Sequence, residues 1–119
     1  MPVRSSNSPV LKWPERRQVH VALTDWARAA ALRDPSIRRV GYFGSYARDT
    51  WGVGSDLDVV IIVATATAPF TARAAGWNLT SLPVPVQVLA YTEAEWASMS
   101  LRDERFDRTI AHETVWVYP

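Results

Sequence analysis

The stretch VGYFGSYARDTWGVGSDLDVVIIV, residues 40–63, decides the fold of this 119-residue chain. Apolar residues predict a strand that ends at Phe43 and a second strand over residues 57–63. The second run is apolar almost without interruption, which predicts that this strand is buried on both faces. A short helix over residues 45–49 and a glycine-containing loop over residues 50–54 are expected between the strands.

Polar residues lie where the first strand ends and where the second begins. Gly44-Ser45 follows the first strand, and the backbone of a glycine can approach a phosphate closely because it carries no side chain. Asp56 and Asp58 are two positions apart, so in a strand both point to one face, about 7 Å from each other. Two such carboxylates repel each other unless a cation lies between them, and Mg²⁺ accepts this kind of ligand. If the strands are neighbours, the pattern predicts a phosphate-binding turn beside a magnesium site.

Each of these features has a simpler interpretation when it is taken alone. A Gly-Ser pair is commonly only a turn, and aspartates that precede a strand can be solvated strand-end residues. We favour the functional interpretation because both features adjoin strongly apolar strands, and consecutive strands are usually neighbours in a sheet.

Composition restricts the class of protein. Apolar residues make up 48% of the chain, which predicts a soluble single domain over residues 14–119, preceded by a flexible arm over residues 1–13. The absence of cysteine excludes disulfides and fits a cytoplasmic location. No apolar run approaches the roughly 20 residues of a membrane span, so we expect no membrane partner. With 13 Lys and Arg against 12 Asp and Glu, we also expect no long nucleic acid as a partner.

The remaining pattern predicts an α/β domain, in which a small mixed sheet is flanked by helices. Predicted helices cover residues 14–34, 45–49, 70–78, 92–99 and 102–112, and predicted strands cover residues 39–43, 57–63, 83–91 and 114–118. The prolines at 83 and 85 restrict the third strand to a sheet edge or to a strand start. Thr92 and Glu95 have the spacing of a capping box, which marks a helix start. His20 is expected on the exposed face of the first helix.

The residues around the two aspartates resemble those of the minimal nucleotidyltransferases of the DNA polymerase β superfamily. Their signature is GS, ten residues, and DxD, and it matches Gly44, Ser45, Asp56 and Asp58. Residues 45–48, SYAR, are similar to the family's SxARG form, with an aspartate at position 49 where glycine is usual. Residues 85–92 and the closing HETVWVY are similar to the family's third and last strands.

The resemblance implies a nucleotidyltransferase fold and a set of site residues. Gly44, Ser45 and Arg48 are expected to bind the nucleotide triphosphate, with ATP as the substrate. Asp56 and Asp58 are expected to be catalytic and to hold Mg²⁺.

One departure from the family bears on catalysis, because the third catalytic carboxylate falls on Gln87 here. In a two-metal site that carboxylate helps hold a metal and can accept the proton of the attacking hydroxyl. A glutamine amide carries no charge and cannot accept a proton at neutral pH. Glu93 and Glu95 follow this strand, but Glu95 is explained as the capping partner of Thr92, and we do not expect either to act as the replacement. The lone His112 is expected to be structural.

The resemblance also implies a partner. Minimal nucleotidyltransferases commonly pair with a small helical HEPN toxin, and a type VII-like antitoxin of this kind transfers AMP from Mg-ATP to a tyrosine of the toxin. The alternative is an antitoxin that has lost transfer through Gln87 and neutralises its partner by binding alone. Transfer to a small molecule such as an aminoglycoside requires a second domain, for which 119 residues leave no room. The nucleotide base and the acceptor stay open.

Overall fold

Four strands form one mixed sheet in the computed structural model, which describes residues 13–99, 101 and 105–119. The elements in chain order are α1 (Arg16–Arg33), β1 (Ile37–Phe43), α2 (Ser45–Arg48), β2 (Leu57–Val63), η3 (Phe70–Gly76), β3 (Val86–Thr92), α3 (Glu93–Met99), α4 (Arg105–Glu113) and β4 (Val115–Tyr118). The strand order is β3-β2-β1-β4. β1 is antiparallel to β2 and β4, whereas β2 is parallel to β3. The predicted α/β fold with a small mixed sheet is confirmed.

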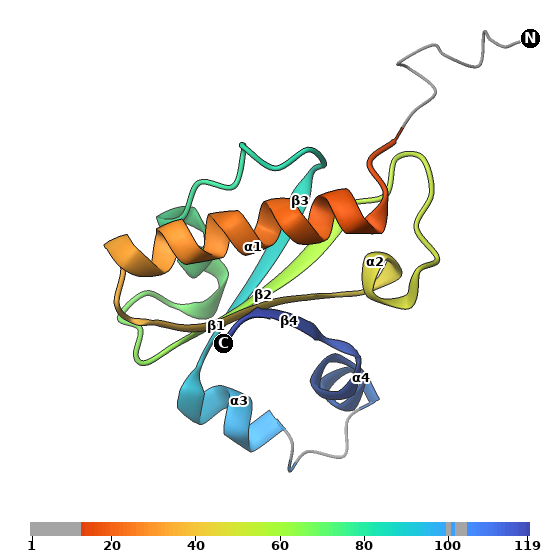
Figure 1. Ribbon diagram of the computed structural model, residues 1–119. Coiled ribbons are helices and arrows are strands. Elements are labelled where there is room, and N and C mark those ends of the chain that lie inside the picture. The colour runs from red at the N-terminus through yellow and green to blue at the C-terminus, as the bar shows by residue number, and fades with distance from the viewer. Residues whose placement is uncertain (1–12, 100, 102–104) are drawn as a thin grey trace, which may run out of the picture.

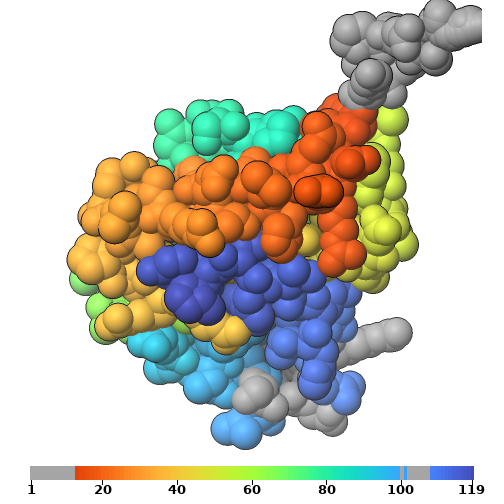
Figure 2. Space-filling model, viewed as in Figure 1, coloured from red at the N-terminus to blue at the C-terminus, as the bar shows by residue number. Residues whose placement is uncertain are grey.

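The sheet is covered by α1 on one face and by α3 and α4 on the other (Figure 1). Apolar residues of α1, among them Leu23 and Ala27, pack with Val59 and Ile61 of β2 in the main core. The intervening Val60 is also fully buried. The predicted burial of β2 on both faces is therefore confirmed. Figure 2 shows α1 beside the C-terminal segment on one side of the molecule, where α1 contacts β4.

β3 lies at an edge of the sheet, as its prolines predict. Pro83 and Pro85 precede the strand, which begins at Val86 rather than at residue 83. The carbonyl of Pro85 accepts a hydrogen bond of 2.8 Å from the backbone N–H of Leu57, so the parallel pairing with β2 starts directly after the second proline.

The start of α1 differs from the prediction that Pro14 is its first residue. Glu15 is the N-cap, and its backbone N–H donates a hydrogen bond of 2.9 Å to Gln18 Oε1. The carbonyl of Pro14 instead accepts a hydrogen bond of 2.8 Å from the hydroxyl of Tyr46, which ties Pro14 to α2. The helix ends at Arg33, as the following Asp34-Pro35 predicts.

The predicted helix over residues 70–78 is wrong in type and in length. Residues 70–76 form the 3₁₀ helix η3, and Trp77 already has extended backbone angles. A 3₁₀ helix has about three residues per turn and is used in short pieces, so the 3.6-residue periodicity expected for Phe70, Ala74 and Trp77 does not apply. Arg73 fixes the turn by donating from Nε to the carbonyl of Ala68 at 3.0 Å.

Two further predictions reach beyond the described residues. Of the predicted arm over residues 1–13, residues 1–12 lie outside them, whereas Trp13, the last residue of that prediction, packs against the core. The start of the predicted helix over residues 102–112 also lies outside them, and α4 is described from Arg105. None of the described helices combines the length and the apolar composition that a membrane span requires.

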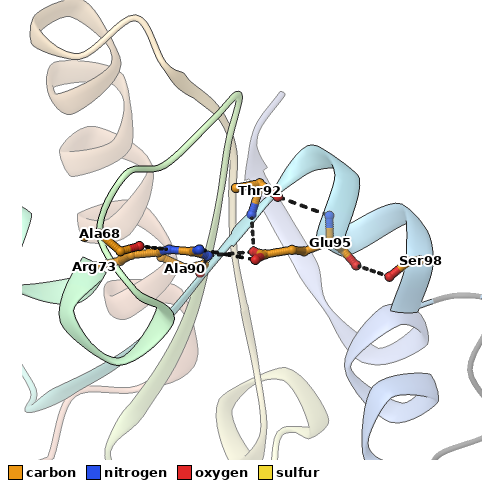
Figure 3. A network of polar contacts seen from close by, with 6 residues as sticks. All are labelled: Ala68, Arg73, Ala90, Thr92, Glu95 and Ser98. Carbon is orange, nitrogen blue, oxygen red and sulfur yellow. Dashed lines mark hydrogen bonds and ion pairs between the residues drawn. The ribbon is translucent and has the colours of Figure 1, made fainter.

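The capping box at the start of α3 is confirmed, and it belongs to a larger polar network (Figure 3). Thr92 Oγ1 accepts from the backbone N–H of Glu95 at 3.1 Å, and Glu95 Oε1 accepts from the backbone N–H of Thr92 at 2.8 Å. The Glu95 carboxylate also accepts hydrogen bonds from Arg73 Nη1 at 2.6 Å and from Arg73 Nη2 at 3.2 Å. Hydrogen bonds from Arg73, and then from the Thr92 amide, hold the pKa of Glu95 below its usual range. This network ties η3, β3 and α3 together.

Replacing Arg73 with methionine should make the thermal stability of the protein less sensitive to acid. Ionised Glu95 stabilises the fold above its unfolded pKa of 4.5, and this contribution is lost as the pH falls through the lower folded pKa. We expect Tm to fall more steeply for the wild type than for Arg73→Met between about pH 6 and about pH 3. Arg28→Met, on the exposed face of α1, is the control and should keep the wild-type slope. Equal slopes for Arg73→Met and the wild type would contradict the network's role.

Candidate functional site

The register between β1 and β2 brings the Gly-Ser turn to the aspartates. Phe43, the last residue of β1, pairs with Asp58 of β2, so Gly44 lies beside Asp58. Gly44 has a φ of 76° and a ψ of −150°, a conformation that favours glycine. A Cβ atom built on Gly44 would also overlap Asp58 Oδ2. Position 44 therefore requires glycine for its backbone conformation and for the space that the carboxylate occupies.

Asp56 and Asp58 lie on the face of the sheet opposite α1. Leu57, between them, is fully buried in the core beneath α1, and side chains alternate along a strand. Burial is the largest cause of the raised pKa of Asp58. The negative charges of Asp56 and Glu113 also raise this pKa, whereas the positive charge of Arg48 lowers it. The structure thus holds two neighbouring carboxylates together in a partly desolvated position, which is an arrangement that a cation stabilises.

Gln87 lies directly beside this pair. It is the register partner of Asp58 in the parallel pairing of β2 with β3. Its side-chain Nε2 donates a hydrogen bond of 3.2 Å to Asp56 Oδ2. An amide that donates to Asp56 therefore occupies the position expected for a third carboxylate. This amide carries no negative charge for a metal ion and cannot act as a base toward a substrate.

Glu113, at the end of α4, is a site residue that the sequence analysis missed. Its Oε2 accepts a hydrogen bond of 2.6 Å from the backbone N–H of Gly44, and its Oε1 accepts one of 2.9 Å from Arg48 Nη1. The side chain is only 14% exposed. Glu113 lies 69 residues from Gly44 in the sequence, so no local pattern could have revealed the contact.

α2 turns the chain sharply between the two halves of the site. The carbonyl of Ser45 accepts a hydrogen bond of 2.9 Å from the backbone N–H of Thr50, and no residue that the structure describes hydrogen-bonds to Ser45 Oγ. Asp49 caps α2 with a left-handed φ of 59°. This conformation explains why the family usually has glycine there, and aspartate is one of the few other residues that tolerate it.

The two glutamates considered as replacements for the third carboxylate lie elsewhere. Glu95 is bound by Arg73, and Glu93 approaches Arg38 Nε at 3.6 Å. Both follow the far end of β3, about 16 Å along the strand from Gln87. Neither can therefore act beside Asp56, in agreement with the sequence analysis.

The two histidines lie on helices, His20 on α1 and His112 on α4. His112 is exposed. The expectation for His20 is wrong, because it is half-buried and its Nδ1 lies 3.0 Å from the hydroxyl of Tyr42. Tyr42 points from β1 toward α1, on the face opposite the carboxylates, and this tertiary contact draws His20 out of solvent.

The carboxylate pair fits a hard divalent cation. Within residues 13–99, 101 and 105–119, no three His, Asp or Glu side chains are grouped in a way that could hold a metal ion. Mg²⁺ does not require such a group, because it is commonly bound by one or two carboxylates and completes its shell with substrate phosphates and water. Asp56 and Asp58 are therefore the residues that would hold it, and their position on one face of the sheet, beside the Gly44 turn and Gln87, is the observation that supports this assignment.

Gly44→Ala should disturb the site more than its backbone strain alone predicts. Gly54 is a matched control, since it also has a positive φ of 89° but has nothing within 4 Å of an added Cβ. Gly54→Ala should lower the free energy of unfolding by about 1 kcal/mol, and Gly44→Ala by about 1–3 kcal/mol more, because Asp58 must move. Urea unfolding measures both values. Equal losses in the two variants would show that the contact with Asp58 has no effect.

Asp58→Asn should stabilise the protein near neutral pH in the absence of divalent cations. Because the folded pKa of Asp58 is raised, its ionisation destabilises the fold above the unfolded pKa, and this penalty disappears as the pH falls below that value. We therefore expect a higher Tm for Asp58→Asn than for the wild type at neutral pH, with the difference shrinking on acidification. A variant that melts below the wild type at neutral pH would contradict this electrostatic assignment.

Comparisons with known proteins show the family of the chain and its fold. The family model described as a nucleotidyltransferase domain matches residues 26–112. A proposed nucleotidyltransferase from Sulfolobus solfataricus has a similar crystal structure, with a TM-score of 0.58 and 18% identity over 85% of this chain and 80% of that chain. A toxin–antitoxin crystal structure with AMP-PNP has a TM-score of 0.47 and 13% identity, covering 88% and 73% of the two chains. No match was found among curated proteins. With three-quarters of its length matched by the family model, the chain belongs to the nucleotidyltransferase domain family.

Proposed function

We propose that this protein is a minimal nucleotidyltransferase that transfers AMP from Mg-ATP to a tyrosine of a HEPN toxin partner, and that it acts as the antitoxin of that toxin in the cytoplasm. The observation that carries the proposal is the contact between the Gly44 turn and Asp58, which brings a phosphate-binding turn and a carboxylate pair together. The sequence resemblance supports the toxin partner and the tyrosine acceptor.

The site residues have distinct roles in this reaction. The hydroxyl of Ser45 and the guanidinium of Arg48 bind and orient the triphosphate, and Asp56 and Asp58 hold Mg²⁺. When bound, Mg²⁺ neutralises charge on the triphosphate and makes the α-phosphorus more electrophilic. The phenol oxygen attacks the α-phosphorus in line and its proton passes to solvent. The bond between the α-phosphorus and the bridging oxygen of the β-phosphate breaks, and pyrophosphate leaves with that oxygen. Positioning of the two reactants provides most of the rate enhancement.

A protein partner is also supported by an aromatic row on the face opposite α1. In this row Phe70 contacts Tyr91, Tyr91 contacts Trp96, and Trp96 contacts Trp116, with the ring centroids of each pair 5.1–5.7 Å apart. Arg39 lies over the ring of Trp116, 3.6 Å from its centroid. Phe70 is 39% exposed and the other three rings are half-buried. Aromatic residues and arginine are enriched at protein interfaces, which makes this row a candidate for the partner surface.

Gln87 favours a second candidate function, in which the protein neutralises its partner by binding alone. The phenol proton needs an acceptor, and the Gln87 amide cannot provide one. Instead, this amide donates to Asp56 and holds it in place. In this alternative the fold and nucleotide binding persist without transfer.

The two functions separate in a transfer experiment with α-labelled ATP and Mg²⁺. The protein is incubated with an extract of its source cells, and labelled proteins are resolved by mass. An active transferase labels one acceptor, and the label disappears in Asp56→Asn/Asp58→Asn. If Asp58→Asn retained transfer, the role of Asp58 in holding Mg²⁺ would be excluded. If it lost transfer but still neutralised the toxin, neutralisation would not depend on transfer. Absence of label in an extract whose toxin is neutralised, with Mg-ATP still bound, would support the binding-only function.

Gln87→Asp tests the missing carboxylate directly. A carboxylate at this register position restores a metal ligand and a base, so the transfer rate should rise by at least about tenfold, measured with the same labelled ATP. Gln87→Glu is the control, because its longer side chain carries the same charge to a different position. An unchanged rate in Gln87→Asp would show that transfer does not depend on a third carboxylate here.

A further inference from the structure

Glu113 occupies Arg48, which the proposed function assigns to the triphosphate, and Gly44, which the sequence resemblance assigns to it. Its carboxylate bridges the backbone N–H of Gly44, at 2.6 Å, and the guanidinium of Arg48, at 2.9 Å. Both are charge-assisted hydrogen bonds, which are shorter and about twice as strong as neutral ones. A backbone N–H has a single hydrogen, so Gly44 cannot bind Glu113 and a phosphate oxygen well at the same time.

The position of Glu113 is not favoured by its own helix. It is the last residue of α4, where the helix dipole disfavours a negative charge. Its side chain is largely buried, and it lies near enough to Asp58 to disfavour ionisation of that residue. Three carboxylates thus share one region, and among the described residues the hydrogen bonds to Glu113 come from the Gly44 amide and Arg48. This arrangement resembles the binding of an anionic ligand by the site, with the ligand supplied by the chain itself.

We propose that Glu113 is an intramolecular competitor of the triphosphate: its carboxylate holds the Gly44 amide and Arg48 in the nucleotide-free protein and leaves them when phosphate binds. This inference rests on the proposed function of the same site. Glu113 therefore lowers the affinity of the site for triphosphate and keeps the nucleotide-free site ordered.

The test compares the binding of magnesium tripolyphosphate to the wild type and to Glu113→Gln by calorimetry. Glutamine has nearly the same shape but forms only neutral hydrogen bonds, so phosphate displaces it more easily, and we expect binding about tenfold tighter. Glu93→Gln is the matched control. Glu93 also approaches an arginine that is 53% exposed, as Arg48 is, but at the far end of β3. This control should bind with wild-type affinity.

A second measurement needs no variant. In the wild-type protein, the amide resonance of Gly44 is followed by NMR while tripolyphosphate and Mg²⁺ are added. The resonance should shift in step with saturation, because the carboxylate partner of this N–H is replaced by phosphate. A Gly44 amide that stays unchanged while tripolyphosphate binds would overturn the proposal.

The outcomes separate this inference from the proposed function. If the wild type binds tripolyphosphate, and Glu113→Gln binds with equal or lower affinity, Glu113 is a structural support and the competitor proposal fails alone. If neither protein binds tripolyphosphate or Mg-ATP, the nucleotide site itself fails, and both proposals fall. Tighter binding by Glu113→Gln, with an unchanged Glu93→Gln control, supports both.

Discussion

The antiparallel register of β1 and β2 is the constraint on which the site depends. Because Phe43 pairs with Asp58, the turn that follows β1 meets the carboxylates at the start of β2 with no room for a side chain at Gly44. A slip of one residue would turn Asp58 to the opposite face. The slip is prevented by burial, since β2 packs against α1 on one side and contacts α3 on the other. Core packing and site geometry are therefore fixed together.

The carboxylates at the start of β2 destabilise the fold, whereas the buried apolar residues of the same strand stabilise it. Burial and the charge of Asp56 both disfavour ionised Asp58, and Glu113 adds a third negative charge. Arg48 is the cation that opposes them. Such concentrations of like charge are typical of functional sites, where binding a ligand or a cation recovers the cost. The neutral Gln87 adds no further negative charge to this cluster.

Local signals predicted the parts of the fold that local interactions control. The apolar run of β2, the capping box of Thr92 and Glu95, and the prolines before β3 each act within a few residues, and the structure agrees with them. The errors lie where distant contacts decide. The hydroxyl of Tyr46 binds the carbonyl of Pro14 outside α1, and Tyr42 draws His20 out of solvent. Residues 70–76 form a 3₁₀ helix whose arginine is bound by Glu95 of a later helix.

The sequence by itself determined that a glycine turn and two carboxylates would meet, because the motif spacing and the two-residue period of a strand set their faces. It also placed Gln87 at the third position, where the structure has it beside Asp58. Only the tertiary structure decided that Glu113 holds the Gly44 amide and Arg48. That contact depends on how α4 packs against the sheet, and Glu113 lies 69 positions from Gly44, too far for a local sequence pattern to specify it.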